Sequence, residues 1–305
     1  MNNVYVLAKA LVFARTGELD YREDVIDNLM AAIGTEQGGR TLALGRELVA
    51  YVIAADLVNL PAEEDEDRRF RSWLRQTLTE PLDGSTLQAT QESRPNNWGT
   101  HAGASRVAVA LYLGDEEELD RAAKVFKGWL GDRDVYTGFE YGKLYWQADP
   151  DHPVGINILG AMKDGYSIDG AQPEEMRRGG EFRWPPEETG YPWEALQGAL
   201  TEAELLSRAG YDVWRWEDSA LLRAVQFLYR IGWPPDGDDV WLPWLINHAY
   251  GTDYATSTPA RPGKNMGWTD WTHSRARDHA FENGEQSSTD SKVLGTKQVM
   301  IEASQ

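Results

Sequence analysis

Apolar residues recur at spacings of three and four along most of this chain, which is the period of an amphipathic helix. Residues 3–15 and 20–33 show the pattern first, and Gly17 and Gly34 follow them as stop signals. A chain that repeats this pattern has to bury one face of each helix against other helices. The periodicity therefore predicts an all-α protein.

The next periodic segments extend the helical part of the chain. Residues 41–58 are mostly apolar, so this helix should be buried on most sides, and residues 63–79 open with the acidic run of a solvated helix start. Short stretches such as residues 136–146 are the only β-like patterns, and residues 80–95 have the polar composition of a loop. Further helices are predicted at residues 96–112, 115–130, 153–165, 190–209, 216–231 and 238–250.

The number of helices and their short links point to one architecture. About ten helices in series predict stacked helical hairpins, and successive antiparallel pairs commonly close into a toroid or solenoid. The predicted fold is an (α/α) toroid, an incomplete barrel of antiparallel helical hairpins. No compositional linker stands out before residue 275, so residues 1–275 are expected to form this domain. Residues 276–305 are polar and weakly periodic, which predicts a C-terminal tail or a short extra element.

The charge balance and residue types exclude several classes of function. A net charge of −19 argues against nucleic acid as a partner. An acidic ligand still fits, because a basic cleft on an acidic protein attracts it through the local field. The absence of cysteine excludes disulfides and cysteine nucleophiles, and no apolar run of about 18 residues would span a membrane. No cofactor or metal is expected, and the oligomeric state is left open.

Localisation is left between two alternatives. The N-terminal residues lack the basic start, apolar block and cleavage site of a secretory signal. A secreted or periplasmic protein is expected if a signal has been removed, and a cytoplasmic location is the alternative.

The aromatic content suggests a ligand class. Thirteen tryptophans and thirteen tyrosines are many for 305 residues, and nine of the tryptophans follow residue 180. Packing in the core explains any single one of them. A sugar-binding cleft is the functional alternative, because flat aromatic faces cover the apolar faces of pyranose rings.

Three segments carry more polar chemistry than a loop or a helix cap needs. In RPNNWGTH, residues 94–101, an N-cap explains one of the two asparagines but not the neighbouring Trp, Thr and His. DGAQPEEMRRGG, residues 169–180, joins glycines, acidic residues and two arginines, and a charged surface loop is its alternative interpretation. GYPWEAL, residues 190–196, enters a long helix, where simple packing would also explain Tyr191.

Taken in order, these segments resemble the alginate lyase family of (α/α)-toroid polysaccharide lyases. VYVLAKALVFARTGELDYREDVIDNL resembles the first helical hairpin of the family, and LALGRELVAYVIAADLV resembles its next long helix. RPNNWGTHAG resembles the Asn-Asn-His segment. DGAQPEEMRRGG and YPWEALQGALTEAELLSRAG resemble the Asp-Gly…Glu…Arg-Gly segment and the helix after it. The similarity covers about residues 3–230, and its specificity comes from the order and spacing of the motifs together.

The resemblance implies roles for individual residues. Asn97 stands where the family has the asparagine that binds the substrate carboxylate, and Arg178, directly before a glycine, stands at the family's arginine. Tyr191 stands at the catalytic tyrosine, four residues before an Ala-Leu pair. The stretch from arginine to tyrosine is longer here than in the family's usual pattern, which leaves Arg177 and Arg183 as rivals of Arg178.

One position departs from the family. The histidine that directly follows the catalytic asparagine is replaced by Trp98, and the nearest histidine is His101, one helical turn later. Residues four apart share a helix face, so His101 is expected beside Asn97 and is kept as a catalytic candidate, although whether it replaces the missing histidine is open. The further candidates for substrate binding are Asn96, Trp98, Arg106, Arg183, Trp193, His248, Tyr250, Tyr145 and Trp146.

The implied reaction is β-elimination from a uronic-acid polymer such as polymannuronate or glucuronan. Removing the C5 proton requires that the neighbouring carboxylate be neutralised by donors, a role for Asn97 and an arginine. A base takes the proton and an acid protonates the leaving C4 oxygen. With Trp98 at the histidine position, elimination on one side of the ring by Tyr191 alone is favoured.

Two other functions remain as alternatives. A glycoside hydrolase on a similar helical barrel would use a carboxylic acid and a carboxylate, which Asp169, Glu181 and Glu194 could supply. A non-catalytic carbohydrate-binding helical protein would need the aromatic residues but neither Tyr191 nor Arg178.

Overall fold

The computed structural model describes residues 3–274, and its regular structure is almost entirely helical within that range. The predicted all-α class is therefore confirmed. The tail predicted at residues 276–305 lies outside the described residues. The helices are α1 (Asn3–Thr16), α2 (Leu19–Ala32), α3 (Thr41–Leu57), α4 (Glu64–Thr79), α5 (Leu87–Ser93), α6 (Asn97–Leu113), α7 (Glu116–Leu130), α8 (Pro173–Met176), α9 (Tyr191–Arg208), α10 (Trp216–Arg230), α11 (Leu242–Tyr250) and α12 (Thr269–Thr272). Short 3-10 turns lie at Leu60–Ala62, Arg177–Gly179, Val213–Arg215 and Gly237–Asp239, and one antiparallel pair joins β1 (Met162–Lys163) to β2 (Tyr166–Ser167).

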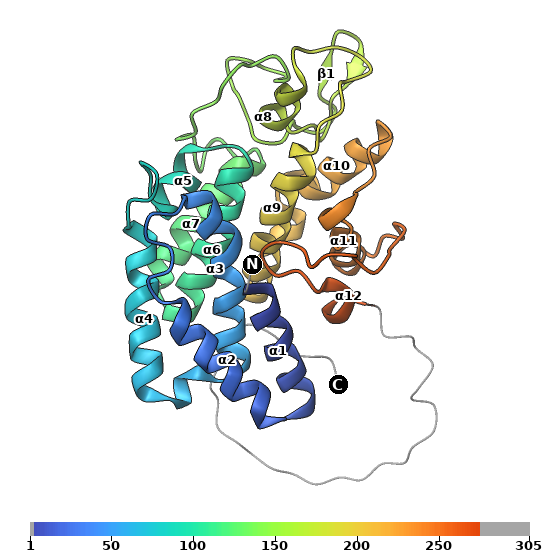
Figure 1. Cartoon of the computed structure of the whole chain (residues 1–305). Helices are drawn as coiled ribbons and strands as arrows, with labels where there is room; N and C mark the ends of the chain where they lie inside the picture. Colours follow the sequence, from blue (N-terminus) through green and yellow to red (C-terminus); the bar gives the residue numbers. More distant parts are fainter. Residues whose placement is uncertain (1–2, 275–305) are drawn as a thin grey trace.

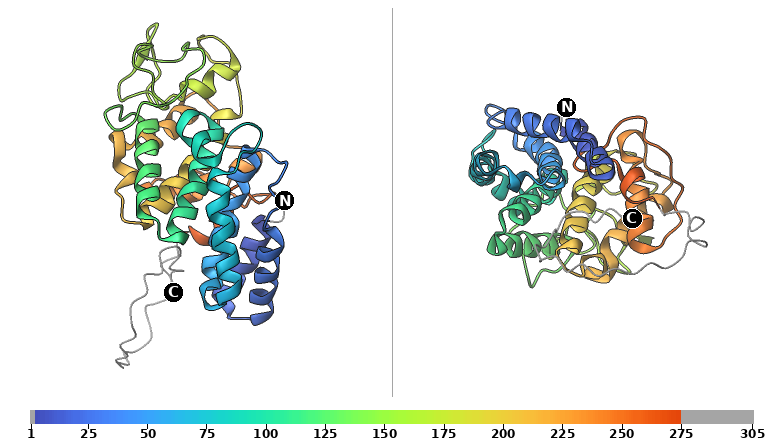
Figure 2. Two further views of the ribbon diagram at one scale, coloured as in Figure 1. Left: turned by 90° about the vertical axis from the view of Figure 1, so that its left-hand side faces the viewer. Right: turned by 90° about the horizontal axis from the view of Figure 1, so that it is seen from below.

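The helices form two layers (Figure 1). In the inner layer, α1, α3, α6 and α9 pack side by side in that order. The outer helices are α2, α4 and α7, and two of them form antiparallel hairpins with an inner helix that is next to them in the chain, α1 with α2 and α6 with α7. Seen from below, the helices follow a curved row from α1 to α9 (Figure 2). This arrangement agrees with stacked helical hairpins, and the closed toroid stays a prediction.

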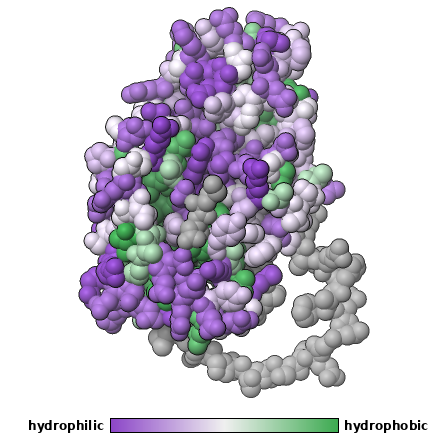
Figure 3. Space-filling model, in the orientation of Figure 1, coloured by the Kyte–Doolittle hydropathy of each residue, from purple (hydrophilic) through white to green (hydrophobic). Residues whose placement is uncertain are grey.

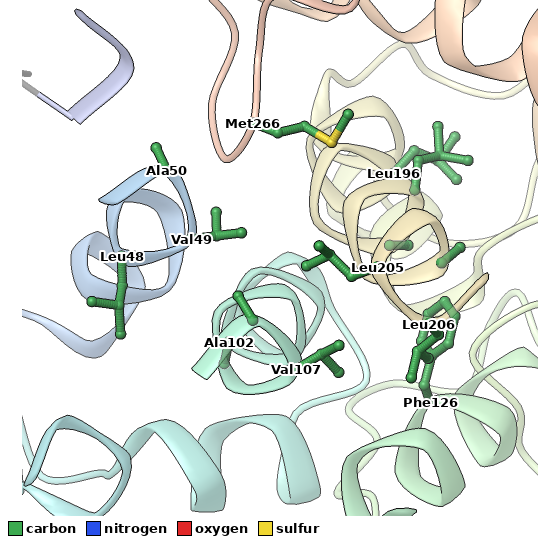
Figure 4. Close-up of a cluster of buried hydrophobic side chains, with 14 of the residues drawn as sticks. Leu48, Val49, Ala50, Ala102, Val107, Phe126, Leu196, Leu205, Leu206 and Met266 are labelled. Carbon is green, nitrogen blue, oxygen red and sulfur yellow. The ribbon is translucent and has the colours of Figure 1, made fainter. Parts of the chain in front are cut away.

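Helix α6 is the centre of the packing, because glycines let its neighbours approach closely. A Cβ at Gly45 of α3 would lie 2.9 Å from the backbone nitrogen of Ala102, and one at Gly198 of α9 would lie 2.5 Å from that of His101. Both flanking helices therefore touch the α6 backbone around His101. Apolar side chains fill the space between these helices (Figure 4), and those labelled there are Leu48, Val49, Ala50, Ala102, Val107, Phe126, Leu196, Leu205, Leu206 and Met266.

Local signals explain where the central helices begin and end. The Asn96 side chain caps α6 by accepting a hydrogen bond from the Trp98 N–H, and Gly114 ends the helix with a φ of 68°. Asp115 then caps α7 by accepting from the Glu118 N–H, and acidic residues fill the first turn. The N-cap interpretation of one asparagine in the Asn-Asn pair is thus confirmed for Asn96.

Residues 131–190 form a cap of loops, β1, β2 and α8 over one end of the bundle (Figure 1). Arg223 of α10 holds this cap, because its guanidinium donates to the Asn157 carbonyl and to the Asp169 carboxylate, each at 2.7 Å. Gly170 has a φ of 79°, and a Cβ there would lie 2.1 Å from the Arg223 carbonyl oxygen. Only glycine fits this contact. The face of the molecule shown in Figure 3 is mostly hydrophilic, including the cap.

Three predicted elements are wrong. Residues 153–165 form turns and β1 instead of a helix, because Gly155 packs against Trp129 and Gly160 takes a φ of 76°. The loop predicted at residues 80–95 contains α5, which Thr86 caps by accepting from the Ala89 N–H. Residues 136–146 are irregular rather than β.

One predicted helix is shorter in the structure than expected. The helix predicted at residues 238–250 begins at Leu242, after the 3-10 turn at Gly237–Asp239. Among residues 3–274, no helix has the length and apolar character needed to cross a membrane.

Candidate functional site

The first turn of α6 presents a side-chain amide without a hydrogen-bond partner among residues 3–274. Asn97 is the first residue of α6 and is 5% exposed. Its backbone N–H donates to the Glu175 carboxyl, whereas its side chain makes no hydrogen bond within residues 3–274. A nearly buried amide needs a partner, and a ligand can supply one. Asn97 therefore has the placement of a binding residue.

Helix α8 ties the first turn of α6 to the first turn of α9. Glu175 accepts from the Asn97 N–H, and the Gln172 side chain donates to the Pro192 carbonyl at 3.2 Å. Burial raises the pKa of Glu175 to about 8, although the positive charges of Arg178 and Arg177 act in the opposite direction. The Glu175 carboxyl is therefore mostly protonated at neutral pH and adds little negative charge between the two helix ends.

Tyr191 and Arg178 lie together at the start of α9. Tyr191 is the first residue of the helix and is 39% exposed. The Arg178 guanidinium carbon lies 4.3 Å from the centre of the Tyr191 ring. The two rival arginines are engaged elsewhere, because Arg177 pairs with Glu174 and Arg183 pairs with Glu187 at 3.0 Å. Among the three candidate arginines, Arg178 is the one that contacts Tyr191.

His101 lies one turn deeper, in a group of charged residues that we call the Glu194 cluster: Arg46, His101, Glu194, Lys264 and Asn265. The His101 side chain is fully buried, with Nδ1 2.7 Å from Asn265 Oδ1 and Nε2 3.1 Å from Glu194 Oε1. Glu194 also accepts from the Arg46 guanidinium and, at 2.7 Å, from the Lys264 ammonium. The cluster joins α3, α6 and α9 to the segment before α12.

The ionisation of Glu194 decides what it can do. Burial by itself raises the pKa of Glu194, but hydrogen bonds and positive charge from His101, Lys264 and Arg46 hold this pKa well below its usual range. Glu194 is therefore a carboxylate at neutral pH. A general acid has to carry a proton near the working pH, so Glu194 does not suit that role.

Helices α6 and α9 meet at His101 and Glu194, whose side chains lie 3.1 Å apart. Asn97 and His101 are four residues apart on α6, and Tyr191 and Glu194 are three apart on α9, so each pair shares one helix face. His101 contacts Asn265 and Glu194, and its expected place beside Asn97 stays a prediction. Its burial and its two hydrogen-bonded nitrogens, however, keep it from contact with a polymer.

Arg106 is a correction to the predicted binding residues. It is 1% exposed, and its guanidinium donates to Glu118, to Gln91 and to Glu92. Gln91 and Glu92 belong to α5 and Glu118 belongs to α7, so Arg106 connects α6 to both of these helices. A substrate carboxylate has no open donor to reach there.

Two of the predicted aromatic residues also lie in the packed interior. Trp193 is buried, and its Nε1 donates to the Trp233 carbonyl at 3.0 Å. Tyr250 packs edge-on against Trp214, with ring centres 5.4 Å apart. These contacts support the packing interpretation of Trp193 and Tyr250 over a role in the cleft.

The remaining candidates divide between the cap and other parts of the surface. Trp146 is buried in the cap and donates to the Gly180 carbonyl at 3.2 Å, and the neighbouring Tyr145 is half-buried. Trp98 is half-buried beneath the Arg94 guanidinium, 4.6 Å from its ring. His248 is exposed on α11 and lies against His273, with ring centres 5.1 Å apart, rather than against Tyr191.

Sequence reasoning missed Arg46, Lys264 and Asn265. Arg46 did carry a signal, because a charged residue inside the mostly apolar residues 41–58 requires a buried partner. Lys264 and Asn265 carried none, since they follow His101 by more than 160 residues and lie in an irregular segment. Their place is set by the fold, through hydrogen bonds of Asn265 to His101 and to the Gly45 carbonyl.

Comparison with known proteins agrees with the motifs. The model of a family described as alginate lyase matches residues 22–135, which include α3 and all of α6. Neither the curated proteins nor the solved structures gave a match. The matched range contains Asn97 and His101 but ends before Arg178 and Tyr191. Over residues 22–135 the chain is therefore similar to the alginate lyase family, and this similarity supports a polysaccharide lyase that acts on an acidic polysaccharide.

Proposed function

We propose that this lyase cleaves a polymer of uronic acid by β-elimination, with Tyr191 as the base and then the acid. The observation that carries the proposal is the Arg178 guanidinium beside an exposed Tyr191, 4.3 Å from its ring. Tyr191 can serve as the proton acceptor, and the neighbouring Arg178 can bind a carboxylate. These are the two functions that elimination from a uronate requires.

The carboxylate on C5 has to be neutralised before the C5 proton can leave. Removal of that proton places negative charge on the carboxylate oxygens, so donors aimed at them stabilise the transition state. Arg178 supplies a full positive charge, and the unpartnered Asn97 amide supplies N–H donors. Because Glu175 is mostly protonated at neutral pH, it does not oppose the substrate charge.

The helix ends support the same charge distribution. The N-terminal ends of α6 and α9 carry the partial positive charge of the helix dipole, which favours an anion nearby. Helix α8 bonds to both turns through Glu175 and Gln172. The proposed site therefore collects an arginine, an amide and two helix ends around one substrate carboxylate.

In the reaction, Tyr191 as its phenolate takes the C5 proton on Oη, and the electrons of the C5–H bond form the C4–C5 double bond as the C4–O bond breaks. The leaving C4 oxygen then takes the proton back from Tyr191. One residue serves both steps only if the proton and the oxygen lie on the same side of the ring. We propose that His101 acts as a positioning residue through the Glu194 cluster, because its buried ring does not reach a polymer.

The three carboxyl groups that the hydrolase alternative would use do not form a suitable pair. The Asp169 carboxylate accepts hydrogen bonds from Arg223 and from the Gly160 N–H. The Glu194 carboxylate contacts Arg46, His101 and Lys264. Glu181 is exposed on the cap. A glycoside hydrolase needs one protonated and one ionised carboxyl group flanking the same bond, and these contacts do not favour that arrangement.

The stereochemistry of the substrate tests the proposal. We expect polymannuronate or glucuronan, with both groups on one side, to be cleaved at least about a hundredfold faster than polyguluronate, because an additional acid–base group contributes on that order. The measurement is the rate of ultraviolet absorbance increase with each polymer at equal uronate concentration. A preference for polyguluronate would require a second catalytic group opposite Tyr191 and would overturn the single-tyrosine mechanism.

A further inference from the structure

A cavity of about 540 Å³ opens on the cap, beside the segment that carries Arg178. Its walls include Lys143 and Tyr145 from the loop after α7, Lys163 from β1, and Glu181 and Phe182 from the segment after the 3-10 turn at Arg177–Gly179. Two lysines and two aromatic rings around one opening are the residue types that bind an acidic sugar. The cavity is not explained by the elimination chemistry at Tyr191.

The aromatic wall of the cavity is held in place from behind. The Phe182 ring packs edge-on against Trp146, with ring centres 4.8 Å apart. Trp146 in turn is buried, and its Nε1 donates to the Gly180 carbonyl at 3.2 Å. Phe182 is therefore oriented by a buried residue of the cap before any ligand arrives.

The two lysines give the cavity a positive charge on an acidic protein. The Lys163 ammonium donates to the Gln147 carbonyl at 3.1 Å and lies 5.8 Å from the centre of the Phe182 ring, so two of its three N–H donors remain open. Lys143 is exposed and has no ion-pair or hydrogen-bond partner within residues 3–274. Glu181 supplies one opposing charge, which leaves a net charge of about +1 at the opening.

The cavity adjoins the proposed site of elimination through a direct chain of contacts. The Gly142 N–H, at the edge of the cavity, donates to the Glu174 carboxyl at 3.1 Å. Glu174 pairs with Arg177, the residue before Arg178. A Cβ at Gly142 would lie 2.6 Å from the Arg177 guanidinium, so the loop rests directly on this segment.

We propose that this cavity is a second sugar subsite, which binds another uronate residue of the polymer whose cleavage is proposed above. Lys143 and Lys163 receive the carboxylate of that residue, and Tyr145 and Phe182 cover an apolar face of its ring. The identification of the ligand as a uronate rests on the proposed function. The subsite would strengthen binding of a long chain without taking part in the chemistry at Tyr191.

The test is a pair of charge-removing substitutions with a matched control. We expect Lys143→Gln combined with Lys163→Gln to raise the KM for the polymer about tenfold, with kcat unchanged, since two charge contacts to a flexible ligand are lost. Lys124→Gln, an exposed lysine of α7, removes the same kind of charge away from the cavity and should leave KM unchanged. An unchanged KM in the double variant would overturn the subsite.

Two further measurements keep the test decisive. Lys143→Gln alone removes the charge of a side chain that has no ion-pair or hydrogen-bond partner within residues 3–274, so a raised KM in this variant does not reflect misfolding of the cap. Titration calorimetry with the polymer in a Tyr191→Phe background measures binding without turnover, and the lysine substitutions should weaken it by the same factor. If the wild-type protein cleaves no uronate polymer but binds one in a way that depends on the two lysines, the proposed function is contradicted and the subsite is supported. If the protein cleaves the polymer but binding does not depend on the lysines, the proposed function is supported and the subsite is contradicted.

Discussion

Replacing Tyr191 with phenylalanine is expected to lower kcat by between about a hundredfold and ten-thousandfold, the range that one general acid–base residue contributes. The substitution removes only a hydroxyl, from a side chain that is 39% exposed. That hydroxyl makes no hydrogen bond within residues 3–274, so the fold should lose little stability. The measurement is kcat on the best uronate polymer, with the melting temperature recorded for the same preparation.

A second tyrosine provides the control for this prediction. Tyr5 of α1 is 54% exposed, and Tyr5→Phe removes the same hydroxyl far from α9 in sequence. It should leave both kcat and stability unchanged. Full activity in Tyr191→Phe would remove Tyr191 from the mechanism, whereas a melting temperature that falls together with kcat would point to unfolding instead.

Replacing Glu194 with alanine is expected to lower the free energy of unfolding by about 3 to 5 kcal/mol, the usual result of deleting one partner of a buried ion pair. The Glu194 side chain is 16% exposed and accepts from Arg46, His101 and Lys264. Without it, two positive charges and a buried imidazole lose their shared partner. Urea unfolding at pH 7 measures the change, and Glu188→Ala, in the exposed loop before α9, is the matched control.

The pH dependence of this difference has a definite sign. The pKa of Glu194 is lowered in the folded protein, so its carboxylate stabilises the fold at any pH above the ordinary carboxyl pKa of 4.5. The stability gap between the wild type and Glu194→Ala should be constant above that pH and should shrink as the pH falls below it. A gap that grows on acidification would contradict the assignment of Glu194 as an ionised carboxylate.

The sequence predicts the helices that have strong end signals. The bounds of α6 and α9 differ from the predicted ones by one residue at each end, because Asn96 caps α6, Gly114 ends it and Pro192 stands in the first turn of α9. The helix predicted at residues 153–165 is wrong, because the apolar residues of this segment pack within the loops of the cap and do not form one face of a helix. The buried Asn157 side chain holds that cap by donating to the Trp146 carbonyl and accepting from the Ala148 N–H, and no periodicity encodes these contacts.

The sequence predicts only those residues of the candidate site that stand in recognisable motifs. Asn97, Arg178 and Tyr191 stand in motifs, so a resemblance carries them. The choice among Arg177, Arg178 and Arg183 needed the structure, because it depends on which guanidinium has a carboxylate partner nearby. Lys264 and Asn265 reach His101 through long-range packing of the segment before α12, and the local sequence contains no sign of that contact.

The central claim is that cleavage of a uronate polymer occurs by elimination, and the mass and absorbance of the products test it most directly. Incubation of the wild-type protein with polymannuronate or glucuronan should yield oligosaccharides that absorb in the ultraviolet and are lighter by one water than the hydrolysis products of equal length. Products of the full hydrated mass, with new reducing ends and no absorbance, would contradict the account and move the assignment to a hydrolase.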